Sequence, residues 1–193
     1  ALERPYGRVP SALYGQLWRA LAASMDDEFF GMNARRMKAG SFSFMAAIAL
    51  REPTLGAALE RVLAFCGLVF DGLSPRLVQQ GSLAEIALDE PDGQHSRAFA
   101  YFTLWLMVHG LLCWLAGRRL PILGIDLRCP APGYLEDYRV MFCDNLRFER
   151  PSSRLLFNAD CLAQPVRRSE RELKRFLAGA PANILVRYRD PQS

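Results

Sequence analysis

Histidine, lysine and paired cysteines are scarce in this 193-residue sequence. It contains two histidines and two lysines, and no two of its five cysteines form a C-x-x-C pair. No group of His, Cys and Asp residues has the spacing of metal ligands, so we expect neither a metal nor another cofactor. An odd number of dispersed cysteines also argues against a disulfide framework and favours the reducing cytoplasm.

Signature motifs of enzymes are absent too. The sequence contains no G-x-S-x-G, H-E-x-x-H, P-loop or Rossmann glycine motif. Its adjacent carboxylates, Asp26–Asp27 and Glu136–Asp137, fall on expected helix surfaces, where neighbouring side chains do not face each other. His109 is the only sensible general base, and Thr103 or Cys113 would have to bond to it in an open cleft. A small hydrolase or transferase is therefore the least favoured hypothesis, and we do not expect an enzyme.

One long apolar segment dominates what is present. Residues 98–117 (AFAYFTLWLMVHGLLCWLAG) carry no formal charge and are as long as a bilayer-spanning helix. They lie between two half-polar segments, and no other part of the chain could span a membrane. A helix that is apolar on all sides can also form the core of a soluble domain. We therefore predict one long buried helix and no membrane partner.

Hydrophobic periodicity predicts an α+β fold around this helix. Thr54 is a suitable N-cap for a clear amphipathic helix. A period of two in residues 77–90 predicts a hairpin with Gly81-Ser82 as its turn. Residues 122–129 and 146–159 predict three further strands around one short helix. The expected order is β-β-α-β-α-β-β, an antiparallel sheet with packed helices.

Two N-terminal segments give less complete predictions. Ser11 can cap a helix in which apolar residues recur every four positions from Leu13 to Met25. Residues 41–50 fit a strand and a helix equally, because periodicity does not separate short apolar runs.

Candidate ligand-binding residues come from three places. They are Arg36, Phe42, Phe44, Phe102, Trp105, His109 and Arg128. The three on the long helix share one face, although an aromatic stripe fits a plain hydrophobic core as well. The three in residues 36–44 put a cation beside aromatic rings, a combination that can hold an anionic or carbonyl-bearing ligand, unless this is only a basic turn. The remaining arginine lies on the outward face of a predicted strand.

The C-terminal part of the chain is basic. Between Arg147 and Asp190, ten Arg or Lys residues stand against five Asp or Glu residues. Such a segment can face nucleic acid, although a solvated arginine-rich surface explains the same composition. Ser169 and Glu172 form a capping box, which predicts a single amphipathic helix. Because no helix-turn-helix pair follows, we interpret this helix as a connector.

Several blocks, taken in order, resemble a known family. They read LWRALAASMDDEFFGMNARRMKAGSF, PTLGAALERVLAF, FAYFTLWLMVHGLLCWLAGRRLPI and APANILVRYRD. They are similar to the N-terminal effector-sensing and dimerisation region of AraC-type transcriptional regulators, in the subgroup described as having an arabinose-binding domain. The similarity extends from about Pro10 to Asp190. It implies a sensing domain over residues 1–166 and a connector helix and linker over 167–193, leading to a helix-turn-helix domain absent from this sequence.

The resemblance also implies a function. A bacterial regulator of this kind binds a small-molecule effector, forms a homodimer and contacts DNA only through its C-terminal domain. Effectors in this subgroup are diverse, so the sensing role carries over and the ligand does not. We expect the dimer interface on an apolar helix face within 55–70 or 98–117. The main alternative is a dimerisation module without an effector.

Overall fold

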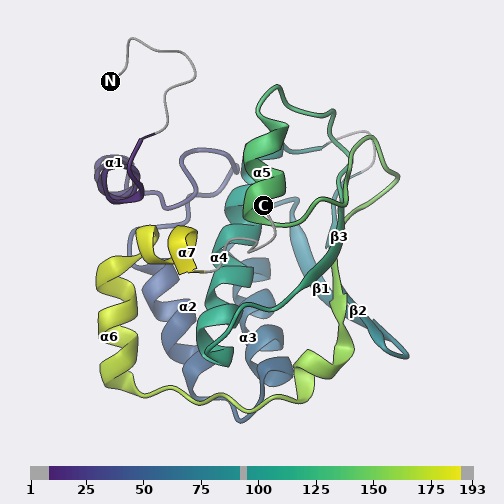
Figure 1. Cartoon of the computed structure of the whole chain (residues 1–193). Coiled ribbons are helices and arrows are strands. Elements are labelled where there is room, and N and C mark those ends of the chain that lie inside the picture. Colours follow the sequence, from purple (N-terminus) through teal and green to yellow (C-terminus); the bar gives the residue numbers. More distant parts are fainter. Residues whose placement is uncertain (1–8, 92–94, 188–193) are drawn as a thin grey trace.

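The computed structural model describes residues 9–91 and 95–187 of the chain, and Figure 1 shows how its elements are arranged. The helices are α1 (Ser11–Met25), α2 (Ser41–Leu50), α3 (Leu55–Val69), α4 (Ala98–Ala116), α5 (Leu135–Met141), α6 (Glu170–Gly179) and α7 (Ala182–Arg187), with a 3-10 helix at Ala159–Ala163. The strands are β1 (Ser74–Gln80), β2 (Leu83–Asp89), β3 (Ile122–Asp126), β4 (Leu146–Arg147) and β5 (Ser153–Asn158). The predicted α+β class and the order β-β-α-β-α-β-β are confirmed.

The five strands form one sheet in the order β1-β2-β5-β3-β4. All neighbours are antiparallel except β3 and the two-residue β4, which are parallel. Gln80 pairs with Leu83, so Gly81 and Ser82 form the predicted two-residue turn, and Gly81 has the positive φ of 59° that such turns require. The apolar side chains of Ile86 and Leu155 pair across β2 and β5 and are buried.

Helix α4 forms the centre of the core. Every residue from 100 to 115 is buried. In Figure 1, α4 runs through the middle of the molecule, with α2 and α6 on one side and the sheet on the other. The helix is long and apolar enough to cross a bilayer, but the chain's own elements enclose it. Its hydrophobicity is therefore that of a core helix, and the predicted long buried helix is confirmed.

The ambiguous segment 41–50 is a helix, α2, because of contacts that lie outside the segment. The carboxylate of Glu28 accepts hydrogen bonds from the backbone N–H groups of Gly40 and Phe42 at its N-terminus. These N–H groups have no partner within the helix, so the carboxylate stabilises this end. Met45 and Ala49 are fully buried in the hydrophobic core.

Helix α1 is confirmed, but its apolar stripe lies on the surface. The N-cap is Pro10 and no side chain caps the helix, so the capping role expected for Ser11 is wrong. Leu13 and Leu17 are 55% and 57% exposed. The buried side of the helix is formed instead by small residues such as Gly15.

The last two helices pack closely onto the domain. The capping box of Ser169 and Glu172 is present at the start of α6. Phe176 of α6 stacks on Trp114 of α4, with ring centroids 4.6 Å apart. The connector role and the boundary at residues 166 and 167 stay predictions, and residues 188–193 of the predicted linker lie outside the described part.

Helix α7 contacts α1 and α4 where both carry glycine. A Cβ on Gly15 would lie 2.9 Å from Cβ of Ala182, and a Cβ on Gly110 would lie 2.5 Å from Cγ2 of Ile184. Real Cβ atoms do not approach other atoms so closely. Both glycines are therefore required for the position that α7 occupies.

Candidate ligand-binding groove

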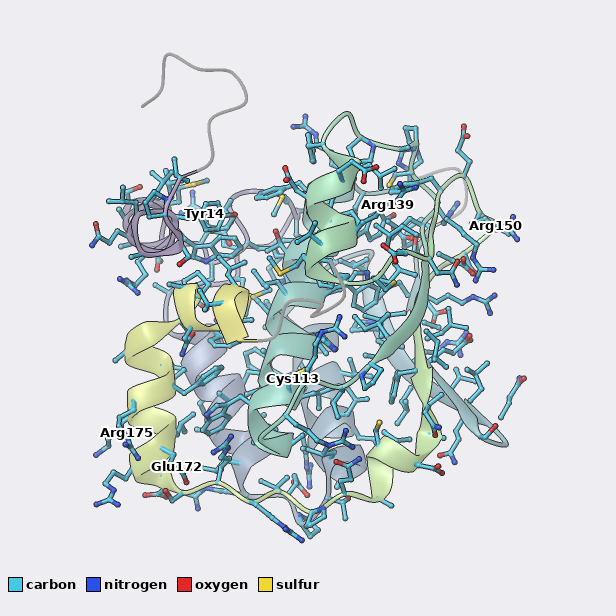
Figure 2. All side chains as sticks on the ribbon, viewed as in Figure 1. Tyr14, Cys113, Arg139, Arg150, Glu172 and Arg175 are labelled. Carbon is cyan, nitrogen blue, oxygen red and sulfur yellow. The ribbon has the colours of Figure 1, made fainter. Side chains whose placement is uncertain are left out.

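A groove with a volume of about 580 Å³ opens between α1, α4, α5 and α7. We call it the aromatic groove, because rings form much of its wall. It is lined by Val9, Ser11, Tyr14, Trp18, Phe99, Phe102, Thr103, Leu106, Tyr134, Asp137, Tyr138, Val140, Met141, Phe142 and Leu185. In Figure 2, Tyr14 marks the side of the groove that α1 provides. A largely apolar cavity of this size with a few polar groups is typical of small-molecule sites.

Stacked rings connect α4 to α5 along this wall. Phe102 stacks on Tyr138 with ring centroids 3.5 Å apart and planes inclined by 13°. Phe142 lies against the same ring of Phe102 at 5.3 Å, and Tyr134 meets Tyr138 edge to face at 5.5 Å. Tyr134 is the N-cap of α5 and Tyr138 lies four residues further on within the helix, and both line the groove.

Thr103 is the buried polar residue of the groove. Its side chain is 2% exposed, and its hydroxyl has no hydrogen-bond partner in the described part of the chain. Burying a hydroxyl without a partner costs about 1–3 kcal/mol. A ligand that bonds to this hydroxyl would recover part of that free energy.

Phenol groups and one carboxylate gather at the α5 side. Burial raises the pKa of Tyr138 well above its usual range, and the nearby Tyr134, Tyr14 and Asp137 raise it further. The phenol of Tyr138 is therefore neutral at physiological pH. Asp137 takes part in none of the ion pairs found between described residues.

A second, smaller cavity of about 230 Å³ lies beyond Trp18 and Leu106, which line both cavities. Its wall includes Phe42 of α2 and Ile184 of α7. Both cavities therefore contact α7.

The structure places two of the seven predicted ligand-binding residues in these cavities. Phe102 lines the aromatic groove and Phe42 lines the second cavity. They are on different cavities, so the structure does not bring them together as one site. Ligand binding by either residue stays a prediction.

Trp105 and His109 lie in the core and line neither cavity. His109 donates from Nε2 to the carbonyl oxygen of Leu120 at 2.8 Å. Burial lowers the pKa of His109 to about 4, so the ring is neutral. The thiol of Cys113 lies 3.4 Å from Nε2, but burial raises the pKa of this thiol to about 12. This contact is therefore enclosed and unreactive, not the open cleft that a hydrolase would need.

The other three predicted residues lie away from both cavities. Arg36 is exposed, and Phe44 is 60% exposed and contacts Phe65 of α3. Arg128 donates to the carbonyl oxygen of Pro91. Their part in ligand binding stays a prediction that the geometry does not connect to a cavity.

Sequence reasoning did not identify Tyr14, Thr103, Tyr134, Asp137 or Tyr138 as site residues. The available signal was the segment GYLEDYRVMF, in which two tyrosines stand four residues apart with two carboxylates between them. Such a pattern gains meaning only when α1 and α4 are known to lie opposite α5.

Comparison with known proteins defines the class first: the N-terminal domain of a transcription regulator. More particularly, residues 1–166 match the family model described as the arabinose-binding domain of AraC transcription regulator, and the chain belongs to this family. No curated protein matches the chain. Among solved structures it is similar to the transcriptional regulator CdpR from Pseudomonas aeruginosa, at 13% identity and a TM-score of 0.48. That match covers 68% of this chain and 43% of the other, so the chain spans less than half of that regulator's length.

Proposed function

We propose that the chain is the effector-sensing and dimerisation domain of a cytoplasmic bacterial AraC-type regulator, and that the aromatic groove binds the effector. The observation that carries this proposal is a largely apolar groove of about 580 Å³ containing a buried hydroxyl without a partner. Small-molecule sites have this combination of size and sparse polar groups. The family membership supports regulation, and an enzyme is not proposed.

Helix α7 is the proposed route of transmission. Leu185 lines the aromatic groove, and Ile184 lines the second cavity. A bound ligand therefore touches the last described helix before the expected DNA-binding domain. The ligand changes the orientation of α7 only as far as it binds one arrangement better than another. DNA is contacted through the C-terminal domain and not through this one.

Homodimerisation is proposed through the exposed side of α1. Residues 100–115 are buried within the chain, which favours another surface over the expected face within 98–117. The exposed stripe of α1 consists of Leu13, Leu17, Leu21 and Met25. Arg19 is the only charged residue of this helix, and it donates to the carbonyl oxygen of Ala180. An uncharged apolar stripe can face its own copy across a twofold axis without repulsion.

The test is thermal unfolding against a panel of amino acids, amines, sugars, carboxylates and aromatic acids. A ligand that binds the native state raises the unfolding midpoint in proportion to RT ln(1 + [L]/Kd). Val140→Trp fills the groove and should abolish the rise. Val186→Trp adds the same ring at a position that is 55% exposed and does not line the groove, and should leave the rise intact. If no compound raises the midpoint while the protein is a dimer by light scattering, the effector-free dimerisation module replaces this proposal.

A further inference from the structure

We propose that the aromatic groove selects an organic cation, a hydrophobic amine or ammonium compound, over neutral and anionic ligands of the same shape. This inference rests on the proposed sensing function and specifies its ligand class. It differs from the sequence-based expectation, in which arginines beside aromatic rings would hold an anionic or carbonyl-bearing ligand.

The charged side chains that line the groove are the first observation behind this inference. Asp137 is the only charged side chain among the described residues that line the groove, and no described Lys or Arg lines it. The nearest cation along α5, Arg139, pairs with Glu136 at 2.8 Å. Figure 2 shows Arg139 on the side of α5 away from Tyr14. Arg119 donates to the carbonyl oxygen of Phe142 and does not line the groove either.

The consequences for a ligand differ with its charge. An anion entering this groove would lose water without gaining a cationic partner among the described residues, and the carboxylate of Asp137 would repel it. An ammonium group beside Asp137 gains an opposite charge that forms no ion pair with another described residue. The groove therefore selects between ligands of the same shape by the sign of the ligand's charge.

Aromatic rings supply the second, independent step. Tyr14, Trp18 and Tyr134 line the groove together with the stacked pair of Phe102 and Tyr138. The faces of such rings attract cations within about 6 Å, by about 0.5–2 kcal/mol for each well-placed contact. Neutral phenol oxygens can also accept hydrogen bonds from an ammonium group. The apolar body of the ligand would lie along Leu106 and Phe102 on α4.

Three compounds with one phenyl ring and matched length test the selection: 2-phenylethylammonium, 2-phenylethanol and phenylacetate. Their affinities are measured by titration calorimetry at pH 7. We expect the ammonium compound to bind three- to tenfold more tightly than the alcohol, and phenylacetate to bind more weakly than both. Asp137→Asn should reduce the preference for the ammonium compound to the part that the aromatic rings supply, without changing the alcohol's own affinity. Asp144→Asn is the matched control, because Asp144 is exposed and does not line the groove, and it should retain the preference.

Three outcomes overturn the inference. One is phenylacetate binding as tightly as the ammonium compound, and another is an unchanged preference in Asp137→Asn. The third is no binding by any of the three compounds. If the broader panel still contains a compound that raises the unfolding midpoint, the sensing function stands and only the cation selectivity falls. If nothing in either set binds, both proposals fall together.

Discussion

Two buried polar side chains on α4 show how similar positions in a sequence acquire different roles. Thr103 and His109 both stand in the long apolar segment, and both are nearly inaccessible to solvent. His109 has a partner in the carbonyl of Leu120, whereas the hydroxyl of Thr103 has none in the described part of the chain. The fold therefore supplies a hydrogen-bond partner for the histidine and leaves the threonine hydroxyl without one among the described residues.

Thr103→Val should separate ligand binding from stability. Valine has nearly the same shape, and it removes a hydroxyl that the protein leaves without a partner. We expect the free energy of unfolding, measured by urea denaturation, to stay unchanged or to rise by up to about 1 kcal/mol. Affinity for any compound that raises the unfolding midpoint should fall at the same time. A loss of stability above 1 kcal/mol would show that the hydroxyl is bonded in the folded protein.

The neutral state of His109 predicts a dependence of stability on pH. Its pKa is about 4 in the folded protein, against an ordinary value of 6.5. The unfolded chain therefore binds the proton first, and stability is lost as the pH falls from about 6.5 towards 4, by at most about 1.4 kcal/mol per pH unit. His109→Gln retains a donor towards Leu120 and should flatten this part of the curve in urea denaturation. An identical pH profile in the variant would refute this assignment.

At the scale of elements, the sequence predicts the strands in which apolar and polar residues alternate and the helices that begin with a clear N-cap. The hairpin at 77–90, the helix after Thr54 and the capping box at Ser169 are found as expected, since each is determined by local residues. The helix at 41–50 depends on Glu28, thirteen residues away from the start of α2, and local periodicity contains no such information. The aromatic groove is still harder to predict from the sequence, because four separate helices contribute its wall.

Substitutions at two glycines test how closely α7 packs against α4. Gly110→Ala should destabilise the protein by about 1–3 kcal/mol, because the added methyl group overlaps Ile184. Gly67→Ala is the control, since Gly67 also stands within a helix but has no atom near its missing Cβ, and it should stabilise by up to about 1 kcal/mol. The double variant Gly110→Ala with Ile184→Ala should relieve this overlap, because the atoms near the added methyl group all belong to the side chain of Ile184. Equal changes in the free energy of unfolding for the two glycine substitutions, measured by urea denaturation, would argue against close packing of α7 on Gly110.

At the scale of the whole molecule, α1 contributes both to the proposed effector groove and to the proposed dimer surface. Its inner side contributes Tyr14 and Trp18 to the groove, and its outer side carries the exposed stripe that includes Leu17 and Leu21. In the proposed function, a ligand that shifts α1 or α7 would change the proposed dimer surface and the C-terminal end of the described residues together.

Charge placed on the stripe should separate the protomers. Leu17→Glu is expected to convert the dimer to a monomer in sedimentation equilibrium while leaving the far-ultraviolet circular dichroism unchanged. Leu68→Glu is the matched control, because Leu68 is 74% exposed on α3, and it should remain dimeric. A dimer that persists in Leu17→Glu and dissociates in Leu68→Glu would move the interface to the α3 surface.

Amide hydrogen exchange with and without a compound that raises the unfolding midpoint tests the central claim most directly. If the aromatic groove is the effector site, exchange should slow in residues 98–106 of α4, in α5 and in α7, with the sheet unaffected. Protection confined to the sheet, or none in α5 and α7, would contradict the account and place the effector elsewhere.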